Sequence, residues 1–413
     1  MEEQVFITDI RVNKVRNIEN FDIHISDKEK KHLIITGKNG SGKTSLLLEL
    51  KQFLTQISNG QDENNEKYYN DYEEILKIIY DLKTSRETHE VISEINKWND
   101  RIKGYGGTIL TFNNRKNILL LNIKNKFLLS YFEAKRTIAL KPPTGIEKIE
   151  LKEKYGIEEK ANSEFIQYIV NLKADRSFAK DDNDLETVKK IDEWFELFEK
   201  NLFELFDTDD IQLEFDRKSY NFNIIEKGKE PYNLTQLSDG YSAILSIVTE
   251  LIMRMELNKT KNYDIQGIVL IDEIETHLHI ELQKKILPFL ISFFPKIQFI
   301  VTTHSPFVIT SIDNAVICDL EKKVVISDLD LSKYSYEAIV ESYFNSDNYS
   351  SILKQKIKRY ELLIDKTILN EEEEEELFDL EGYLDLDTIP KLYSDELQIK
   401  LQQIKLKKMT KKS

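Results

Sequence analysis

The hydrophobic and polar positions of this chain follow two periods, and each period predicts one kind of element. Short apolar runs, or apolar residues at every second position, predict strands because successive side chains of a strand point to opposite faces. The strands predicted in this way are Val5–Val12, Phe21–Ile25, His32–Thr36, Thr108–Phe112, Asn117–Ile123, Phe127–Glu133, Gln212–Phe215, Tyr220–Ile225, Gly267–Glu273 and Ile297–Val301.

Apolar residues spaced three and four positions apart predict helices in other segments. Residues 72–82 carry such a stripe, and residues 91–102 repeat it. Further helices are predicted at Ala161–Ser177, Leu185–Phe206, Ile244–Met255, Glu281–Phe294, Tyr336–Phe344, Ile352–Ile364, Glu371–Leu384 and Lys391–Ile404. The aromatic residues of Leu185–Phe206 recur at helical spacing, which favours a packed core over a ligand-binding surface.

The order of these elements indicates an α/β fold with a mixed, largely parallel central sheet. Two strands precede His32–Thr36, and three more follow the glycines at 104–107, so we expect a separate antiparallel lobe. The predicted divisions are residues 1–57 for the first part of an α/β head, 58–107 for a helical insertion, 108–140 for antiparallel strands of the head, 141–210 for a helical lobe, 211–327 for the second part of the head and 328–413 for a helical C-terminal region.

The stretch from His32 to Leu50 combines a strand, a glycine-rich loop and a helix. Its loop reads GKNGSGKT and matches the phosphate-binding pattern G-x-x-x-x-G-K-[ST] in the required context. Glycines let backbone N–H groups approach phosphate oxygens, and the helix N-terminus favours an anion. We expect Lys43 to reach the β- and γ-phosphates and the Thr44 hydroxyl to bind Mg²⁺. The residues expected to line the nucleotide are Gly37, Lys38, Asn39, Gly40, Ser41, Gly42, Lys43, Thr44 and Ser45.

Two carboxylates end the apolar run that begins at Gly267, as expected at the C-terminal tip of a buried parallel strand. Asp272 is predicted to hold Mg²⁺, directly or through water, and Glu273 to orient and deprotonate the attacking water. The run Ile297–Val301 leads to T-T-H-S-P, which places His304 at a neighbouring strand tip, where a γ-phosphate can be sensed. These motifs predict ATP and Mg²⁺ as ligands and ATP hydrolysis as the reaction.

A second anion-ready turn precedes the helix Ile244–Met255. The segment Leu237–Tyr241, LSDGY, places a polar turn and a glycine before a helix N-terminus. By itself this is an ordinary capping turn. The phosphate loop before it in the chain and the acidic strand after it favour a role in nucleotide binding.

Composition limits the classes of function. The chain has 413 residues, of which 40% are hydrophobic and 32% charged, as in a globular protein with a core. Its formal net charge of −15 disfavours broad electrostatic binding to nucleic acid. The single cysteine, Cys318, fits a reducing compartment, and the longest apolar stretch, Ile286–Phe294, is far shorter than the ~20 residues of a membrane span. We therefore expect a cytoplasmic protein without membrane contacts.

Taken together, four motifs resemble an ABC-class ATPase head in their order and context: Gly37–Thr44, Leu237–Tyr241, Ile268–Glu273 and Thr303–Pro306. Three features resemble the branch of this class that contains SMC, RecF and the double-strand-break repair ATPases. They are the strands ahead of the loop, the LSDGY form of the signature and the sequence DEIETHLH. Within it the chain is most similar to small ATPases of prokaryotic anti-phage systems such as Septu, PARIS and retron-associated modules. The motifs lie within residues 1–310.

This resemblance implies roles for single residues. The strand end Tyr131–Arg136, YFEAKR, would correspond to the Q-loop but has no glutamine, so the coupling between nucleotide and helical lobe is left open. The implied roles are phosphate and Mg²⁺ contacts for Lys43 and Thr44, metal binding for Asp272, general base for Glu273, γ-phosphate sensing for His304, contacts from the opposite subunit for Ser238 and Gly240, and a nucleotide contact for Arg16 in the N-terminal turn.

The resemblance also implies how copies of the chain assemble. Each signature turn in this class completes the site of the other subunit, so two heads sandwich two ATP molecules in a homodimer or a higher even-numbered homo-oligomer. The C-terminal region shows no arrangement of acids, histidines or cysteines typical of a nuclease. We therefore expect a regulatory or sensor ATPase of an anti-phage system that controls a separate effector nuclease. The alternatives are a RecF-like DNA repair ATPase, which would contact nucleic acid, and a transporter ATPase.

Overall fold

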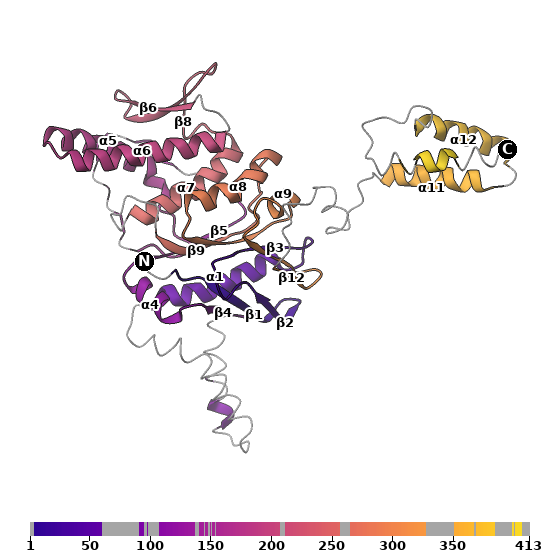
Figure 1. Cartoon of the computed structure of the whole chain (residues 1–413), viewed down its shortest axis with the longest axis horizontal. Coiled ribbons are helices and arrows are strands. Elements are labelled where there is room, and N and C mark those ends of the chain that lie inside the picture. Colours follow the sequence, from indigo (N-terminus) through magenta and orange to yellow (C-terminus); the bar gives the residue numbers. More distant parts are fainter. Residues whose placement is uncertain are drawn as a thin grey trace. The chain divides into compact units, whose positions relative to one another are not determined.

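The computed structural model describes residues 4–59, 91–94, 97, 107–136, 140–206 apart from 144, 148, 150 and 153, 211–256, 265–327, 351–366, 369–384, 399 and 401–406. The chain forms two compact units, residues 1–336 and 337–413. All of the predicted nucleotide motifs fall in the first unit (Figure 1).

A six-stranded sheet in the order β12-β11-β3-β10-β9-β5 forms the centre of the first unit. All neighbouring strands are parallel except β12, which is antiparallel to β11. Every residue of β3, β9 and β10 is buried, as expected of parallel strands covered on both faces. This confirms the predicted α/β fold with a parallel-rich core. The strands are β3 (His32–Thr36), β5 (Phe127–Phe132), β9 (Gln266–Ile271), β10 (Ile297–Thr302), β11 (Ala315–Asp319) and β12 (Val324–Ile326).

A three-stranded antiparallel sheet packs beside this core in the order β2-β1-β4. Its strands are β1 (Ile7–Val15), β2 (Ile18–His24) and β4 (Thr108–Phe112). The long helix α1 (Lys43–Asn59) lies next to it (Figure 1). One apolar core joins the helix to both sheets, and its buried members include Leu46, Leu50, Leu54, Ile10, Ile23, Leu33 and Ile300. The predicted antiparallel lobe is therefore confirmed at its N-terminal strands.

The rest of the predicted antiparallel meander within residues 108–140 is wrong. Asn117–Ile123 belongs to a helix, α4 (Arg115–Ile123), because the Asn114 side chain caps its first turn by accepting the Asn117 N–H at 3.1 Å. The segment after it forms β5, which pairs in parallel with β9 and so extends the core sheet. Its strand prediction was correct, but a strand apolar on both faces fits the buried sheet rather than a lobe with one solvent face.

Helices cover the face of the core sheet opposite α1 (Figure 1). They are α7 (Asp239–Glu256), α8 (Ile280–Phe293) and the short α9 (Pro306–Ile309). Above them lie α5 (Phe165–Asp181), preceded by the 3-10 turn η1 (Asn162–Glu164), α6 (Leu185–Phe206) and a small sheet of β6 (Ile211–Asp216), β7 (Asn221–Glu226) and β8 (Tyr232–Asn233). The aromatic residues of α6 are core, as predicted: Trp194 stacks on Phe198, and both are buried.

The second unit contains α11 (Ser351–Asp365), α12 (Glu371–Tyr383) and a helical stretch at 401–406. Their apolar faces share a small core that includes Tyr360, Leu384 and Leu401. The acidic run at Glu371 starts α12, where Asn370 and Glu373 form a capping box. The predicted helices Ile352–Ile364 and Glu371–Leu384 are thus present.

Some predicted elements lie outside the described residues. These are the helical stripe at 72–82, most of the stripe at 91–102, the helix Tyr336–Phe344 and most of the helix Lys391–Ile404. Residues 91–94 are helical. Among the described helices, none combines the length and the apolar character needed to cross a membrane.

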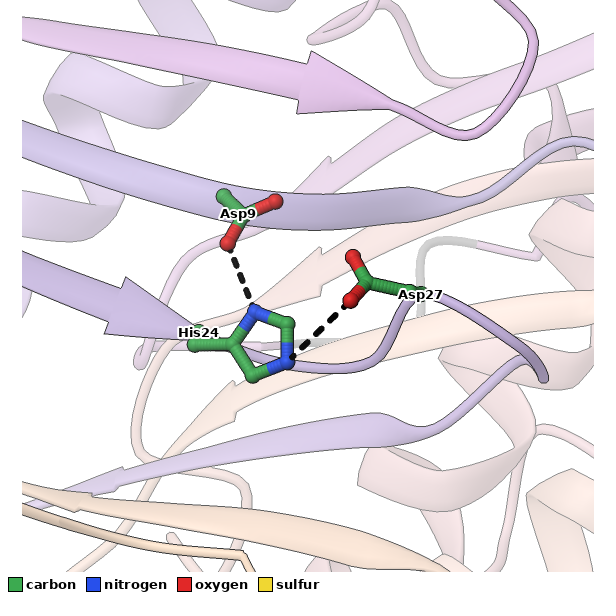
Figure 2. A group of neighbouring side chains, drawn as sticks. All are labelled: Asp9, His24 and Asp27. Carbon is green, nitrogen blue, oxygen red and sulfur yellow. Dashed lines mark hydrogen bonds and ion pairs between the residues drawn. The ribbon is translucent and has the colours of Figure 1, made fainter.

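An exposed ion pair links the two N-terminal strands. Asp9 on β1 lies directly opposite His24 on β2, and its Oδ1 is 2.7 Å from His24 Nδ1. Asp27 approaches the other ring nitrogen, with 3.9 Å between Oδ2 and Nε2 (Figure 2). The hydrogen bond to Asp9 raises the pKa of His24 above its ordinary value.

We expect an NMR titration to place the pKa of His24 above its ordinary value of 6.5. Because the folded-state pKa is raised, the pair stabilises the fold fully below the unfolded pKa, and the stabilisation is lost as the pH rises through the folded pKa. Asp9→Asn should lower the pKa of His24 and reduce the free energy of unfolding by less than about 1 kcal/mol at pH 5, since the pair is exposed. Asp22→Asn on β2, the strand that carries His24, is the control. Equal titration in wild type and Asp9→Asn would contradict the pairing.

Candidate functional site

The phosphate loop connects β3 to α1 at the edge of the core sheet where the parallel strands end. Gly37 and Gly42 need to be glycine there. Both have positive φ, and a Cβ would lie 2.8 Å from Ser41 Oγ at Gly37 and 3.0 Å from Ile18 Cδ1 at Gly42. Only glycine at these two positions lets the loop pass so close to its own side chains and to the β1–β2 hairpin.

Lys43 opens α1 and turns back into the loop. Its Nζ donates to Gly37 O at 2.9 Å and to Lys38 O at 3.1 Å, and the residue is 5% exposed. Burial lowers the pKa of Lys43, while nearby carboxylates, Glu273 first among them, oppose that shift. The ammonium is held inside the loop, where a bound phosphate would meet it.

The other loop residues differ in their exposure. Lys38 points outward and pairs with Glu321 in the turn after β11, with 2.5 Å between Nζ and Oε1. Asn39 and Gly40 are exposed, and Ser45 lies in the first turn of α1. The buried Ser41 hydroxyl has no hydrogen-bond partner among the described residues.

Thr44 and Asp272, the two predicted magnesium ligands, lie together. The Thr44 hydroxyl donates to Asp272 Oδ1 at 3.2 Å, and the Thr302 hydroxyl donates to the same oxygen at 2.6 Å. The Thr44 hydroxyl and the Asp272 carboxylate are both hard oxygen ligands, and Mg²⁺ commonly takes one or two protein oxygens together with phosphate and water. The pair therefore fits a magnesium ion at the edge of the phosphate loop. Thr302 was missed by sequence reasoning, although it begins the T-T-H-S-P motif.

Glu273 and His304 stand at the tips of the adjacent strands β9 and β10. Both are half-buried, and the main-chain N–H of His304 donates to Glu275 Oε1 at 2.5 Å. Burial and then the charge of Lys43 lower the pKa of His304, which favours the neutral imidazole. Glu275, which sequence reasoning did not assign, thus connects the two strand tips.

The predicted signature turn lies at the N-terminus of α7. Ser238 and Asp239 are exposed, whereas Gly240 is buried. A Cβ on Gly240 would lie 3.1 Å from His277 O, in the segment that follows the paired acids. The glycine thus lets α7 pack against that segment while the serine before it faces solvent.

Arg16 occupies the β1–β2 turn, is exposed and has a φ of 51°. Two residues later, Ile18 approaches Gly42 of the phosphate loop. The turn is therefore next to the loop, as the prediction for Arg16 requires, although its nucleotide contact remains a prediction.

A phosphate loop, paired acids and a histidine at the ends of adjacent parallel strands are the arrangement of a P-loop ATPase, and the motif order along the chain is that of the ABC class. A family model described as "AAA domain, putative AbiEii toxin, Type IV TA system" matches residues 33–310, and the chain belongs to this family.

Relatives of two kinds are similar to the chain. A Septu protein PtuA from Bacillus mycoides is 35% identical over 158 residues, 37% of this chain, and the match spans only 22% of that relative. A Septu protein PtuA from Bacillus thuringiensis is 25% identical and covers 92% of this chain and 93% of its own length. A retron Vc95 probable ATPase from Vibrio cholerae is 26% identical, covering 77% of this chain and 74% of its own. Among solved structures, an SMC head domain from Thermotoga maritima is 14% identical, with a TM-score of 0.36 and coverage of 78% and 99%.

Proposed function

We propose that this ATPase binds ATP with Mg²⁺ and hydrolyses it at sites shared between two copies of the chain, as a regulator of a separate effector nuclease in anti-phage defence. The observation that carries the catalytic part is the convergence of Lys43, Thr44, Asp272, Glu273 and His304 on one edge of the core sheet. Magnesium bound by Thr44 and Asp272 would neutralise charge on the phosphates.

The chain's own residues account for the remaining steps of the reaction. Lys43 binds the β- and γ-phosphate oxygens, and the loop N–H groups and the helix N-terminus add to the binding of the anion. The Glu273 carboxylate accepts the proton of the attacking water. The neutral His304 can donate to or accept from the γ-phosphate region without adding a second buried cation beside Lys43.

The signature turn supports shared sites. Ser238 is exposed at the start of a long helix, where backbone N–H groups and the helix dipole favour an anion. A second copy can present this turn to the γ-phosphate bound by the first, so that ATP holds the copies together and hydrolysis releases them. The homodimer is the smallest assembly that completes two such sites.

The regulatory role rests on two observations. The chain is similar to a Septu protein PtuA and to a retron probable ATPase. Apart from the group Asp9, His24 and Asp27, the described residues contain no cluster of three or more histidine, cysteine or acidic side chains that could hold a metal ion. We therefore expect the purified chain alone not to cleave DNA or RNA. Stimulation of its ATPase rate by DNA, steeply reduced by salt, would favour the DNA repair alternative instead.

Replacing Lys43 with alanine should weaken ATP binding about ten- to a hundredfold, because a charge-assisted contact to phosphate is lost. Equilibrium binding of a fluorescent ATP analogue in the presence of Mg²⁺ measures the change. Lys190→Ala, on α6 and away from the loop, is the control. Its ammonium is exposed and pairs with Glu186 at 2.6 Å, so we expect an effect within about twofold. Equal losses in both variants would contradict the assignment of Lys43.

A further inference from the structure

Arg136 lies just beyond β5, and its guanidinium binds the tip of the neighbouring strand β9. Nη1 donates to Asp272 O at 2.8 Å and to Glu133 O at 3.2 Å. Nη2 donates to Glu273 O and Ile274 O, both at 3.1 Å. The residue is 6% exposed. One buried side chain therefore holds three consecutive carbonyl groups of the segment that carries both predicted acids.

The segment that Arg136 holds has an unusual backbone. Glu273 has a φ of 42°, in the left-handed region that is unfavourable for a residue with a Cβ. Its N–H donates to Thr302 Oγ1 at 2.7 Å, and the Ile274 N–H donates to Thr302 O at 3.1 Å. Strand β10 thus binds the N–H groups, and Arg136 binds the carbonyls. The direction of the Glu273 side chain depends on both sets of bonds.

Charge reinforces these contacts. Burial lowers the pKa of Arg136 to about 10, while the carboxylates of Glu275, Asp272 and Glu273 oppose that shift. The guanidinium therefore remains a cation at neutral pH among three carboxylates. Its removal would take away a donor from each of three carbonyls, of which Glu273 O keeps the Thr276 N–H at 3.0 Å, and would increase the repulsion among the acids.

We propose that Arg136 is a positioning residue for ATP hydrolysis, because it fixes the backbone of Asp272–Ile274 and thereby directs the Glu273 carboxylate toward the attacking water. Arg136 ends the segment Tyr131–Arg136, which would correspond to the Q-loop of the ABC class but contains no glutamine. This inference rests on the proposed role of Glu273 as general base. Arg136 touches neither nucleotide nor water in this role, so its removal should affect the chemical step and not ATP binding.

Arg136→Lys and Arg136→Gln test the proposal. Each should lower kcat about ten- to a hundredfold, since a misdirection of about 1 Å has effects of that size, and leave the Kd for ATP within about twofold. Lysine keeps the cation and some donors, so it should retain more activity than glutamine. In a Glu273→Gln background, Arg136→Lys should cause no further loss in single-turnover rate, because the group that it positions is absent.

Arg254→Lys is the matched control. Arg254 is 7% exposed, pairs with Glu250 and donates to Leu129 O and Gly156 O, both at 3.0 Å. Arg254→Lys therefore also removes a buried guanidinium from main-chain carbonyls, but at a place away from the strand tip that bears Glu273. We expect Arg136→Lys and Arg254→Lys each to lower the Tm. Only Arg254→Lys should keep kcat within about twofold of wild type.

The outcomes distinguish a failure of the positioning role of Arg136 from a failure of the proposed ATPase function. A selective loss of kcat that vanishes in the Glu273→Gln background supports Arg136 as a positioning residue. Equal kcat values for Arg136→Lys and Arg254→Lys, a parallel loss of ATP affinity, or a fully additive effect in that background would each overturn it. If Arg136→Gln does not fold, Arg136→Lys decides by the same criteria. Absence of ATP hydrolysis by the wild type would instead refute the proposed function.

Discussion

Glu273→Gln should reduce ATP turnover about a hundred- to ten-thousandfold while ATP still binds, because the amide cannot accept a proton from the attacking water. The change is nearly isosteric, so the hydrogen bonds of the Glu273 main chain to Thr302 and Arg136 are preserved. ATP that is bound and not hydrolysed should hold two copies together. Light scattering with Mg²⁺ and ATP should therefore show a dimer that persists in the variant.

A matched carboxylate provides the control for this experiment. Glu281 in the first turn of α8 is exposed and pairs with Lys284 at 2.9 Å. Glu281→Gln should leave turnover within about twofold of wild type. A Glu273→Gln variant that binds ATP but stays monomeric would contradict the shared sites, and one that retains turnover would contradict the role of the carboxylate.

Ser238→Arg should lower ATP hydrolysis by more than about a hundredfold, because a bulky cation at the signature turn prevents the second copy from closing on the γ-phosphate. Since Ser238 is exposed and precedes α7, the substitution should not disturb the fold. ATP binding to the isolated chain should stay within about twofold of wild type. An equal loss of binding and hydrolysis would place Ser238 in the pocket of its own copy.

Mixing two inactive variants tests the shared site directly. In a dimer of one Lys43→Ala copy and one Ser238→Arg copy, one site carries both defects and the other carries neither. Random mixing makes half of the dimers mixed, so about a quarter of the wild-type rate should return if the sites act independently. No recovery in mixtures that form dimers would exclude composite sites. The single variants mixed with themselves serve as controls.

Much of the site could be predicted from the sequence because its motifs are local. The loop Gly37–Thr44 specifies its own conformation through glycine positions and the helix that follows. Asp272, Glu273 and His304 end apolar runs, and parallel strands bring their ends to one edge of a sheet. For these residues, position along the chain determines position in space.

The errors arose where local pattern was ambiguous. Residues 117–123 contain apolar positions that suit either a strand or a helix, and the cap at Asn114 decided for the helix. β5 was recognised as a strand, yet its partner, β9, lies more than a hundred residues away in the chain. Sequence alone does not fix such a long-range pairing, and so the strand was assigned to the wrong sheet.

The sequence by itself determined the class of this protein, and it located the glycine-rich loop proposed to bind phosphate and the acids and histidine proposed to act beside it, because each depends on residue types within a few positions of one another. The tertiary structure alone decided which distant groups support them. Thr302 meets Asp272, Glu275 meets His304, and Arg136 binds the carbonyls beside Glu273 only because β5, β9 and β10 are neighbours in one sheet. Hydrogen bonds between main chain and side chain across strands depend on this packing and leave no periodic signal in the sequence.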